Sequence, residues 1–184
     1  MSRVGKILIA NPTMTDDNPF AKTVIYIYAD DPINGTTGVI LNKPTENTVQ
    51  DLCYDQKVTY PSSAPKVHLG GPVNKTAIVL LHTDDWNSQN TALAGNNLLI
   101  SSDKLMFLKM SQGNEPIYWR MMVGLSAWAP DQLDMEMRGQ FPYNKSHQWL
   151  TATPTEDIIF GYDGEEQWDK ALELCSQQTI DQWF

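Results

Sequence analysis

Residues 23–42 read Thr-Val-Ile-Tyr-Ile-Tyr-Ala-Asp-Asp-Pro-Ile-Asn-Gly-Thr-Thr-Gly-Val-Ile-Leu-Asn, and this stretch decides the fold. Thr23–Ala29 is rich in β-branched and aromatic residues, as strands are, and it ends at a turn signal, Asp-Asp-Pro. Gly38–Asn42 is a second apolar segment, and the Asn34-Gly35 pair before it is typical of a hairpin turn. The stretch therefore predicts two antiparallel strands joined by a turn.

More strands are predicted on both sides of this hairpin, because further short apolar segments lie between turn signals. Their ranges are Lys6–Ala10, Val67–Leu69, Ala77–His82, Leu98–Ile100, Ile117–Val123 and Ile158–Phe160. These segments do not alternate with long helices, which disfavours a doubly wound parallel sheet.

Helices are fewer. We expect them over Thr48–Cys53, Asp103–Gln112 and Asp131–Arg138, with a longer one starting at Asp163. In the last of these, Trp168, Ala171, Leu172 and Cys175 recur at helical spacing and form one apolar stripe. Strands interrupted by a few helices indicate an α+β protein, and a length of 184 residues fits a single domain over residues 1–184.

The charge of the chain is uneven. There are 13 Lys and Arg residues against 22 Asp and Glu residues, a formal net charge of −9. The segment from Glu156 to the end holds eight acidic residues and one basic residue, which accounts for −7 of that charge. Lysines and arginines are scattered singly elsewhere, so a basic surface for nucleic acid is not expected. Much of the acidity is expected on the solvent side of the last helix and at its N-terminal turn.

The location is expected to be cytoplasmic. The apolar N-terminal stretch is too short for a signal peptide, and no segment approaches the roughly 20 apolar residues of a membrane span. Cys53 and Cys175 are far apart in the chain, which favours two reduced thiols, a disulfide between them being the alternative.

Three motifs could carry chemistry. Leu69-Gly70-Gly71-Pro72 follows a predicted strand; it is interpreted as a tight structural turn, with an anion-binding backbone nest as the alternative. Gly124-Leu125-Ser126-Ala127-Trp128 is one residue away from a G-x-S-x-G nucleophile elbow, for which His68, His82 or His147 would be the base. The bulk of Trp128 in place of the last glycine disfavours this interpretation. His82-Thr83-Asp84-Asp85 offers metal-ligand types without metal-site spacing, so a loop is expected there and no metal site.

The chain resembles the AlgH/YqgE family of small bacterial proteins in six segments that occur in the family's order. These segments are Gly5–Met14, Asn18–Val24, Gly38–Thr45, His68–Val73 with Leu81-His82 after it, Gly124–Glu136 and Trp149–Leu172. They are similar to the family's patterns F-L-I-A-x-P-x-M, F-x-x-T-V, G-x-x-x-N-R/K-P, x-G-G-P-V and L-H, G-x-x-x-W-x-x-x-Q-L-E-x-E, and its closing segment. The resemblance covers roughly Gly5 to Leu174.

This resemblance implies an α+β fold in which a bifurcated, mostly antiparallel sheet is folded into a pseudo-barrel with flanking helices. It implies less about function, because the biochemical activity of the family is not established, although some members are described as transcriptional regulators. Neither the motifs nor the resemblance indicates a cofactor, a metal ion or a catalytic residue.

We therefore expect a non-enzymatic regulatory or protein-interaction protein with an unidentified protein partner. The alternative is a small-molecule or anion-binding protein, or an enzyme, with a site near Lys43 and the Gly70-Gly71-Pro72 turn. Its candidate ligand-binding residues are Asn11, Asn42, Lys43, Gly70, Gly71 and His82. Most of them belong to three turns at strand ends, Asn11-Pro12, Asn42-Lys43-Pro44 and Gly70-Gly71-Pro72, where Lys43 supplies positive charge.

Overall fold

The computed structural model describes residues 2–60, 65–143 and 148–183. In these residues the strands are β1 (Ile7–Ala10), β2 (Val24–Asp31), β3 (Gly35–Ile40), β4 (Pro44–Thr48), β5 (Lys66–Leu69), β6 (Val73–Thr83), β7 (Thr91–Gly95), β8 (Leu98–Ser101), β9 (Trp119–Trp128) and β10 (Trp149–Ala152). The helices are α1 (Val49–Asp55), α2 (Lys104–Ser111), α3 (Gln132–Arg138), α4 (Glu156–Phe160) and α5 (Gly164–Asp181).

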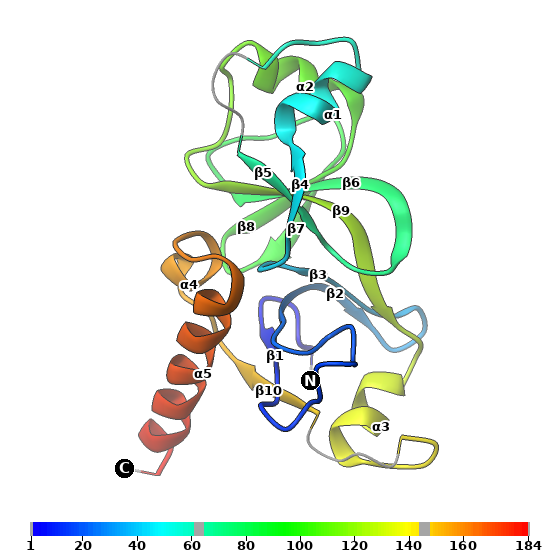
Figure 1. Ribbon diagram of the computed structural model, residues 1–184, viewed down its shortest axis with the longest axis vertical. Coiled ribbons are helices and arrows are strands. Elements are labelled where there is room, and N and C mark those ends of the chain that lie inside the picture. The colour runs from blue at the N-terminus through cyan, green and yellow to red at the C-terminus, as the bar shows by residue number, and fades with distance from the viewer. Residues whose placement is uncertain (1, 61–64, 144–147, 184) are drawn as a thin grey trace.

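The strands form one curled, bifurcated sheet with the order β10-β1-β2-β3-β9-β6-β8-β7 (Figure 1). β4 and β5 branch from this path: β4 pairs with β5, and β5 pairs with β9 in the one parallel pairing among the described strands. The hairpin of β2 and β3 is antiparallel, as predicted, with Asp31 opposite Gly35 at its turn. The α+β fold with a mostly antiparallel sheet, curled into a partial barrel, is confirmed.

β9 is the strand at which the sheet divides. Its first part pairs with β6 on one side and with β5 on the other, at Met122 and Val123. Its last residues, Ser126–Trp128, pair with β3 instead. One strand thus belongs to both arms of the sheet, and the two arms occupy the upper and lower halves of Figure 1.

The lower arm is buried on both faces. In β1, Ile7 and Ile9 pack into one core cluster, and Leu8 and Ala10 pack into another. Because successive side chains of a strand point to opposite faces, this two-sided burial explains why β1 is apolar throughout. Trp168 of α5 and Leu133 of α3 belong to these two different clusters, so α5 and α3 cover opposite faces of the arm.

The structure corrects several predicted elements. Ile158–Phe160, predicted as a strand, belongs to helix α4, whose N-cap Thr155 accepts a hydrogen bond from the backbone N–H of Ile158. Acidic residues in the first turn also favour this helix, and Ile158 and Ile159 are both buried. Three apolar residues cannot distinguish a strand from a helix turn by periodicity. β4, β7 and β10 are strands for which none was predicted.

The other helices were predicted with small shifts at their ends. Asp103, predicted as the first helical residue of α2, is its N-cap, and Thr48 is the N-cap of α1. Asp163 is the N-cap of α5, where the long helix was predicted to start. Asp131, predicted inside α3, lies before the helix at a positive φ of 63° and forms no side-chain cap hydrogen bond.

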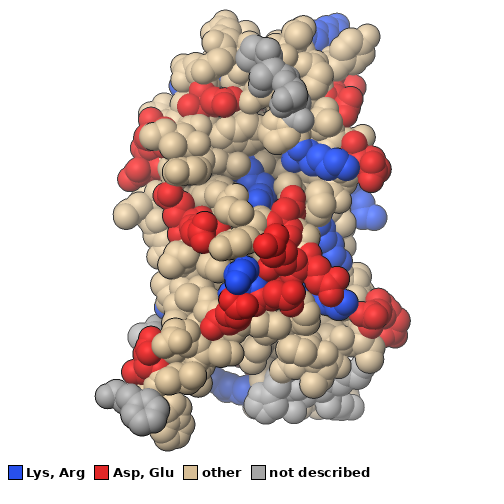
Figure 2. Space-filling view, turned by 60° about the vertical axis from the view of Figure 1, so that its left-hand side comes forward, with Lys and Arg blue, Asp and Glu red and all other residues tan. Residues whose placement is uncertain are grey.

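The acidic residues gather where they were expected. Figure 2 shows Asp and Glu side chains grouped on one face of the molecule, and α4 and the first half of α5 supply exposed Glu156, Asp157, Glu165, Glu166 and Asp169. None of the described helices is long and apolar enough to cross a membrane. Cys53 and Cys175 are both free thiols, so the disulfide alternative is not realised.

Candidate functional site

A pocket of about 450 Å³ lies among the chain segment that precedes β2, the end of β9, α3 and the start of β10. Its lining includes Pro19, Phe20, Pro72, Trp128, Glu136 and Trp149, and we call it the Trp128 pocket. Exposed Thr15, Asp17 and Ala127 also line it, so it opens to the surface. In Figure 1 these segments meet in the lower arm.

Glu136 lies at the centre of the hydrogen bonds that form this pocket. One carboxylate oxygen accepts from the indole N–H of Trp128 and from that of Trp149, each at 3.0 Å. The other oxygen accepts from the side-chain amide of Gln132 at 2.9 Å. Gln132 and Glu136 share one face of α3 because they are four residues apart. Glu136 is 9% exposed, and its three donors among the described residues are neutral.

Three aromatic rings pack around this carboxylate. The ring of Trp149 meets those of Trp128 and Phe20 edge to face, with centroids 6.0 and 5.8 Å apart, an arrangement favoured by the charge distribution of aromatic rings. Both indoles are about 5% exposed, while Phe20 is half-buried. The aromatic wall is therefore fixed by packing and by the two hydrogen bonds to Glu136.

Each of the three turns singled out in the sequence either contacts a lining residue of this pocket or supplies one. The backbone N–H of Asn11 donates to the carbonyl of Gln148, which lines the pocket. The ammonium group of Lys43 donates to the carbonyl of Pro19, another lining residue. Pro72 of the third turn lines the pocket directly. The predicted residues Asn11, Asn42, Lys43, Gly70 and Gly71 are themselves not among the lining residues, and their role in binding stays a prediction.

The two asparagines hold the chain in place. Asn42 is 4% exposed; its side-chain oxygen accepts from the backbone N–H of Val24 at 2.8 Å, and its side-chain nitrogen donates to the carbonyls of Lys22 and Gly164. Asn11 accepts hydrogen bonds from the backbone N–H and the hydroxyl of Thr13, which closes a turn after β1.

Gly70 and Gly71 allow β9 to approach this turn closely. A Cβ on Gly70 would lie within 3.0 Å of the carbonyl oxygen of Gly124, and one on Gly71 within 3.0 Å of that of Leu125. The interpretation of Gly70-Gly71-Pro72 as a tight structural turn fits this geometry. The half-buried Lys43 is near this turn, since its carbonyl accepts from the N–H of Leu69. Burial lowers the pKa of Lys43.

His82 lies in a different part of the molecule, in the core of the upper arm. It is fully buried, with Nδ1 2.8 Å from the carbonyl oxygen of Thr83 and Nε2 2.8 Å from the hydroxyl of Ser101. Burial lowers its pKa, which keeps the ring neutral. It is not among the residues that line the Trp128 pocket. Within the described residues no group of three or more His, Cys, Asp or Glu side chains could hold a metal ion.

Ser126 is not placed as a nucleophile. It is fully buried, and its hydroxyl donates to the carbonyl of Gly70 at 3.1 Å. Of the histidines named as possible bases, His68 and His82 have other partners, and His147 lies outside the described residues.

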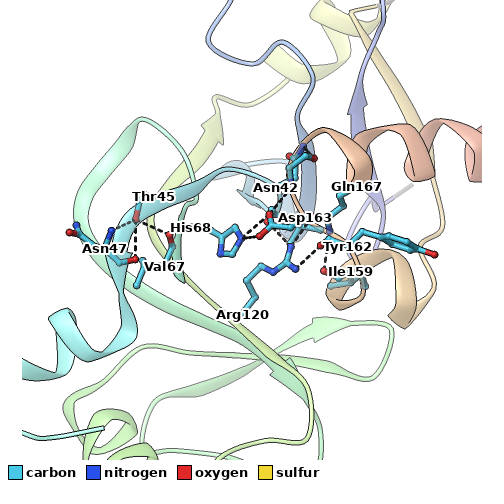
Figure 3. Close-up of polar contacts among 12 residues, drawn as sticks. Asn42, Thr45, Asn47, Val67, His68, Arg120, Ile159, Tyr162, Asp163 and Gln167 are labelled. Atoms are coloured by element: carbon cyan, nitrogen blue, oxygen red, sulfur yellow. Dashed lines mark hydrogen bonds and ion pairs between the residues drawn. The ribbon is translucent and has the colours of Figure 1, made fainter. Parts of the chain in front are cut away.

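A second polar cluster joins the two arms of the sheet (Figure 3). Arg120 of β9 is 8% exposed and donates to the carbonyls of Leu41 and Tyr162 and to the side chain of Gln167, at 2.7–2.8 Å. Nε2 of His68 lies 3.0 Å from both carboxylate oxygens of Asp163, the N-cap of α5. Burial, helped by the charge of Arg120, lowers the pKa of His68, and Asp163 opposes this shift.

Several residues of these clusters were missed by sequence reasoning. Arg120, Glu136 and Phe20 were not named as candidates, and nothing in the local spacing marks Arg120 or Phe20. Glu136 had one available signal: it is four residues after Gln132 on a predicted helix and belongs to a segment of the family resemblance. Trp128 and Trp149 share this carboxylate only in the tertiary structure, and no local sequence pattern indicates it.

The family comparison agrees with the motifs. The model of the AlgH-like family matches residues 7–180. This chain belongs to the AlgH-like family. The AlgH-like chain is 31% identical to a UPF0301 protein of Rhizobium meliloti (strain 1021) over 179 residues, which are 92% of this chain and 85% of the relative. It is 32% identical to a UPF0301 protein of Ruegeria pomeroyi over 184 residues, 98% of this chain and 95% of the relative.

Two solved structures have the AlgH-like fold described above. The solution structure of the AlgH protein from Pseudomonas aeruginosa matches with a TM-score of 0.71 and 25% identity, over 92% of this chain and 87% of that one. A crystal structure of a Corynebacterium diphtheriae protein matches with a TM-score of 0.66 and 23% identity, over 90% and 83% of the two chains, and shows the fold alone. The names of these relatives state no activity.

Proposed function

We propose that this AlgH-like protein is a non-enzymatic regulator that acts in the cytoplasm through contact with a protein partner, and that the Trp128 pocket is its contact site. The observation that carries the proposal is the pocket itself: about 450 Å³, with a fixed aromatic wall beside a buried carboxylate. Aromatic residues fixed in one conformation are typical of protein-interaction sites, because little side-chain entropy is lost when a partner binds.

The surroundings of the candidate catalytic groups support binding rather than catalysis. A nucleophile and its base must lie within hydrogen-bonding reach of each other and of substrate. Ser126 donates to a backbone carbonyl, and His82 is sealed in the core of the other arm. The polar groups near the pocket, in contrast, are fixed by one another, as in a preformed recognition surface.

The test is co-purification with a variant that blocks the pocket. Ala127 is exposed at the pocket, and Ala127→Arg places a long side chain there without removing any hydrogen bond of Glu136. Ala92 is an exposed strand alanine of β7 that does not line the pocket, so Ala92→Arg is the matched control.

We expect a protein that co-purifies with the wild type at physiological salt to be retained by Ala92→Arg and lost from Ala127→Arg. Recovery of no partner, or equal recovery with both variants, would contradict the proposal. Circular dichroism of all three proteins checks that the variants are folded.

A small-molecule ligand is the second candidate. The volume of the pocket favours it, because small-molecule sites usually measure about 300–1,000 Å³. Native mass spectrometry of the purified protein distinguishes this candidate. A low-mass compound bound to the wild type and absent from Ala127→Arg would support it, and an unliganded wild type that still captures its protein partner would exclude it.

A further inference from the structure

We propose that the Trp128 pocket recognises an organic cation, that is, an alkylammonium or guanidinium group. This inference rests on the proposed function, because it concerns the same pocket, and it names the chemistry that the pocket selects. A lysine or arginine side chain of a partner and a free amine share this chemistry.

The charge of the lining is the first argument. The pocket is lined by the carboxylate of Glu136, and among the described residues no lysine or arginine lines it. Glu136 accepts only from neutral donors and forms no ion pair with any described residue. Since a buried charge is costly unless an opposite charge lies beside it, a cation entering the pocket gains more than a neutral group does.

The aromatic wall is the second argument. The negative face of an aromatic ring attracts a cation that lies within about 6 Å of the ring centre, most strongly when the ring is an indole. Phe20, Trp128 and Trp149 all line the pocket, and they also supply apolar surface for the methylene groups next to the charge. An anion, in contrast, would be repelled by the carboxylate of Glu136.

The charge of Lys43 distinguishes a cationic ligand from an anionic one. Its ammonium group donates to the carbonyl of Pro19, and Pro19 lines the pocket, so this positive charge lies next to a lining residue. If the ligand is a cation, Lys43 opposes its binding, and removing the charge strengthens binding. If the ligand is an anion, removing the charge of Lys43 weakens binding. The same substitution therefore separates the two kinds of ligand by the sign of its effect.

The experiment titrates the protein with three probes: n-butylammonium, methylguanidinium and, as an anion, butyrate. Binding is followed through the indole N–H resonances of Trp128 and Trp149, because both groups donate to Glu136. The variants are Glu136→Gln, which removes the charge but nearly keeps the shape, and Lys43→Met. Their controls are Glu46→Gln and Lys75→Met, at exposed positions outside the pocket lining.

We expect saturable shifts of both indole resonances with the two cations and none with butyrate. Glu136→Gln is expected to weaken cation binding about tenfold or more, as loss of a close charge pair does, and Lys43→Met to strengthen it by about threefold. The two control variants are expected to bind as the wild type. Preference for butyrate, no shift with either cation, or weaker cation binding by Lys43→Met would overturn the inference.

The two sources of the cation are separated by competition. If the cation is a side chain of the partner, n-butylammonium displaces the captured partner, and N-acetyl-lysine methylamide binds with the same indole shifts. If it is a free amine, the small probe binds while capture of the partner is unaffected. Failure of the proposed function is distinguishable: partner capture that depends on Ala127 without any cation binding overturns only this inference, and cation binding without partner capture overturns only the proposed partner contact.

Discussion

Glu136 accepts three of the hydrogen bonds that hold the Trp128 pocket together. Glu136→Ala removes the shared acceptor of two buried indole N–H groups and the partner of Gln132. Leaving buried donors without an acceptor is expected to lower the free energy of unfolding by about 3 kcal/mol. Urea unfolding measures this loss. Glu46→Ala, whose side chain is fully exposed, is the control and should change stability by less than about 0.5 kcal/mol.

The buried histidines predict a pH dependence of stability. Burial lowers the pKa of both His68 and His82 below the ordinary 6.5 in the folded chain. His82 faces the carbonyl of Thr83, the hydroxyl of Ser101 and the edge of Trp86, with Asp85 nearby. The unfolded chain therefore binds more protons than the folded chain just below pH 6.5. The contribution of these two histidines to the free energy of unfolding is fully present above pH 6.5. It is lost as the pH falls through their folded-state pKa values.

Urea unfolding at pH 7.5 and at pH 5.5 checks this sign. We expect the wild type to be less stable at pH 5.5, and His82→Gln to lose less stability between the two pH values. The ring resonances of His68 and His82 are expected to titrate at lower pH in the folded protein than in urea. Greater stability of the wild type at pH 5.5 would contradict the argument.

At the scale of single residues, the sequence was most informative about turns. Asn42 and Gly70 were singled out because they follow strands, and both are at positions that the backbone requires. The side chain of Asn42 forms hydrogen bonds with the backbone of Val24, Lys22 and Gly164, which are distant along the chain. Whether a residue binds a ligand or fixes the backbone depends on such partners, and local sequence does not contain them.

Between the elements, β9 makes a close contact with the turn before β6. Gly124 has a φ of 80°, and a Cβ there would lie within 3.0 Å of the carbonyl oxygen of Gly71; Gly113, after α2, has a similar φ of 76° but open space around it. Both Gly→Ala substitutions carry the same strain at positive φ, about 1 kcal/mol, and Gly124→Ala adds a steric clash. We expect losses of about 3 and 1 kcal/mol respectively in thermal unfolding. Equal losses would show that β9 moves freely away from the turn.

Arg120 connects β9 to the α4–α5 segment. Arg120→Lys keeps the charge, but one ammonium cannot reach the three acceptors that the guanidinium fork serves. We expect a loss of about 3 kcal/mol and faster amide hydrogen exchange in α4 and α5, with α2 unchanged. Arg138→Lys, at an exposed position, is the matched control. Unchanged exchange in α4 and α5 would contradict this role of Arg120.

At the scale of elements, prediction succeeded where the pattern was long. The hairpin of β2 and β3 and the apolar stripe of α5 follow from periodicity and turn chemistry. β4 and β7 were missed because their sequences, Pro-Thr-Glu-Asn-Thr and Thr-Ala-Leu-Ala-Gly, are short and poor in aliphatic β-branched residues. They become strands because β4 pairs with the edge of β5 and β7 pairs with the edge of β8.

For the whole molecule, the single domain over residues 1–184 stays a prediction, and it can be tested. β9 pairs with strands of both arms, and Arg120 and Asp163 link the two arms. We therefore expect one cooperative transition in calorimetry, with the calorimetric and van't Hoff enthalpies equal. Two resolved transitions would show that the two arms unfold separately.

The sequence by itself determined the class of fold, the family and the solvent side of α5, because hydrophobic periodicity, turn residues and ordered motifs are local properties of a chain. The scattered lysines and arginines of the sequence also lead us to expect no broadly basic surface. Only the tertiary structure decided that Trp128, Trp149 and Glu136 share one pocket, that His82 is sealed in the core and that Arg120 joins the two arms. Each of these depends on contacts between residues far apart in the chain, and the curling and branching of the sheet bring those residues together.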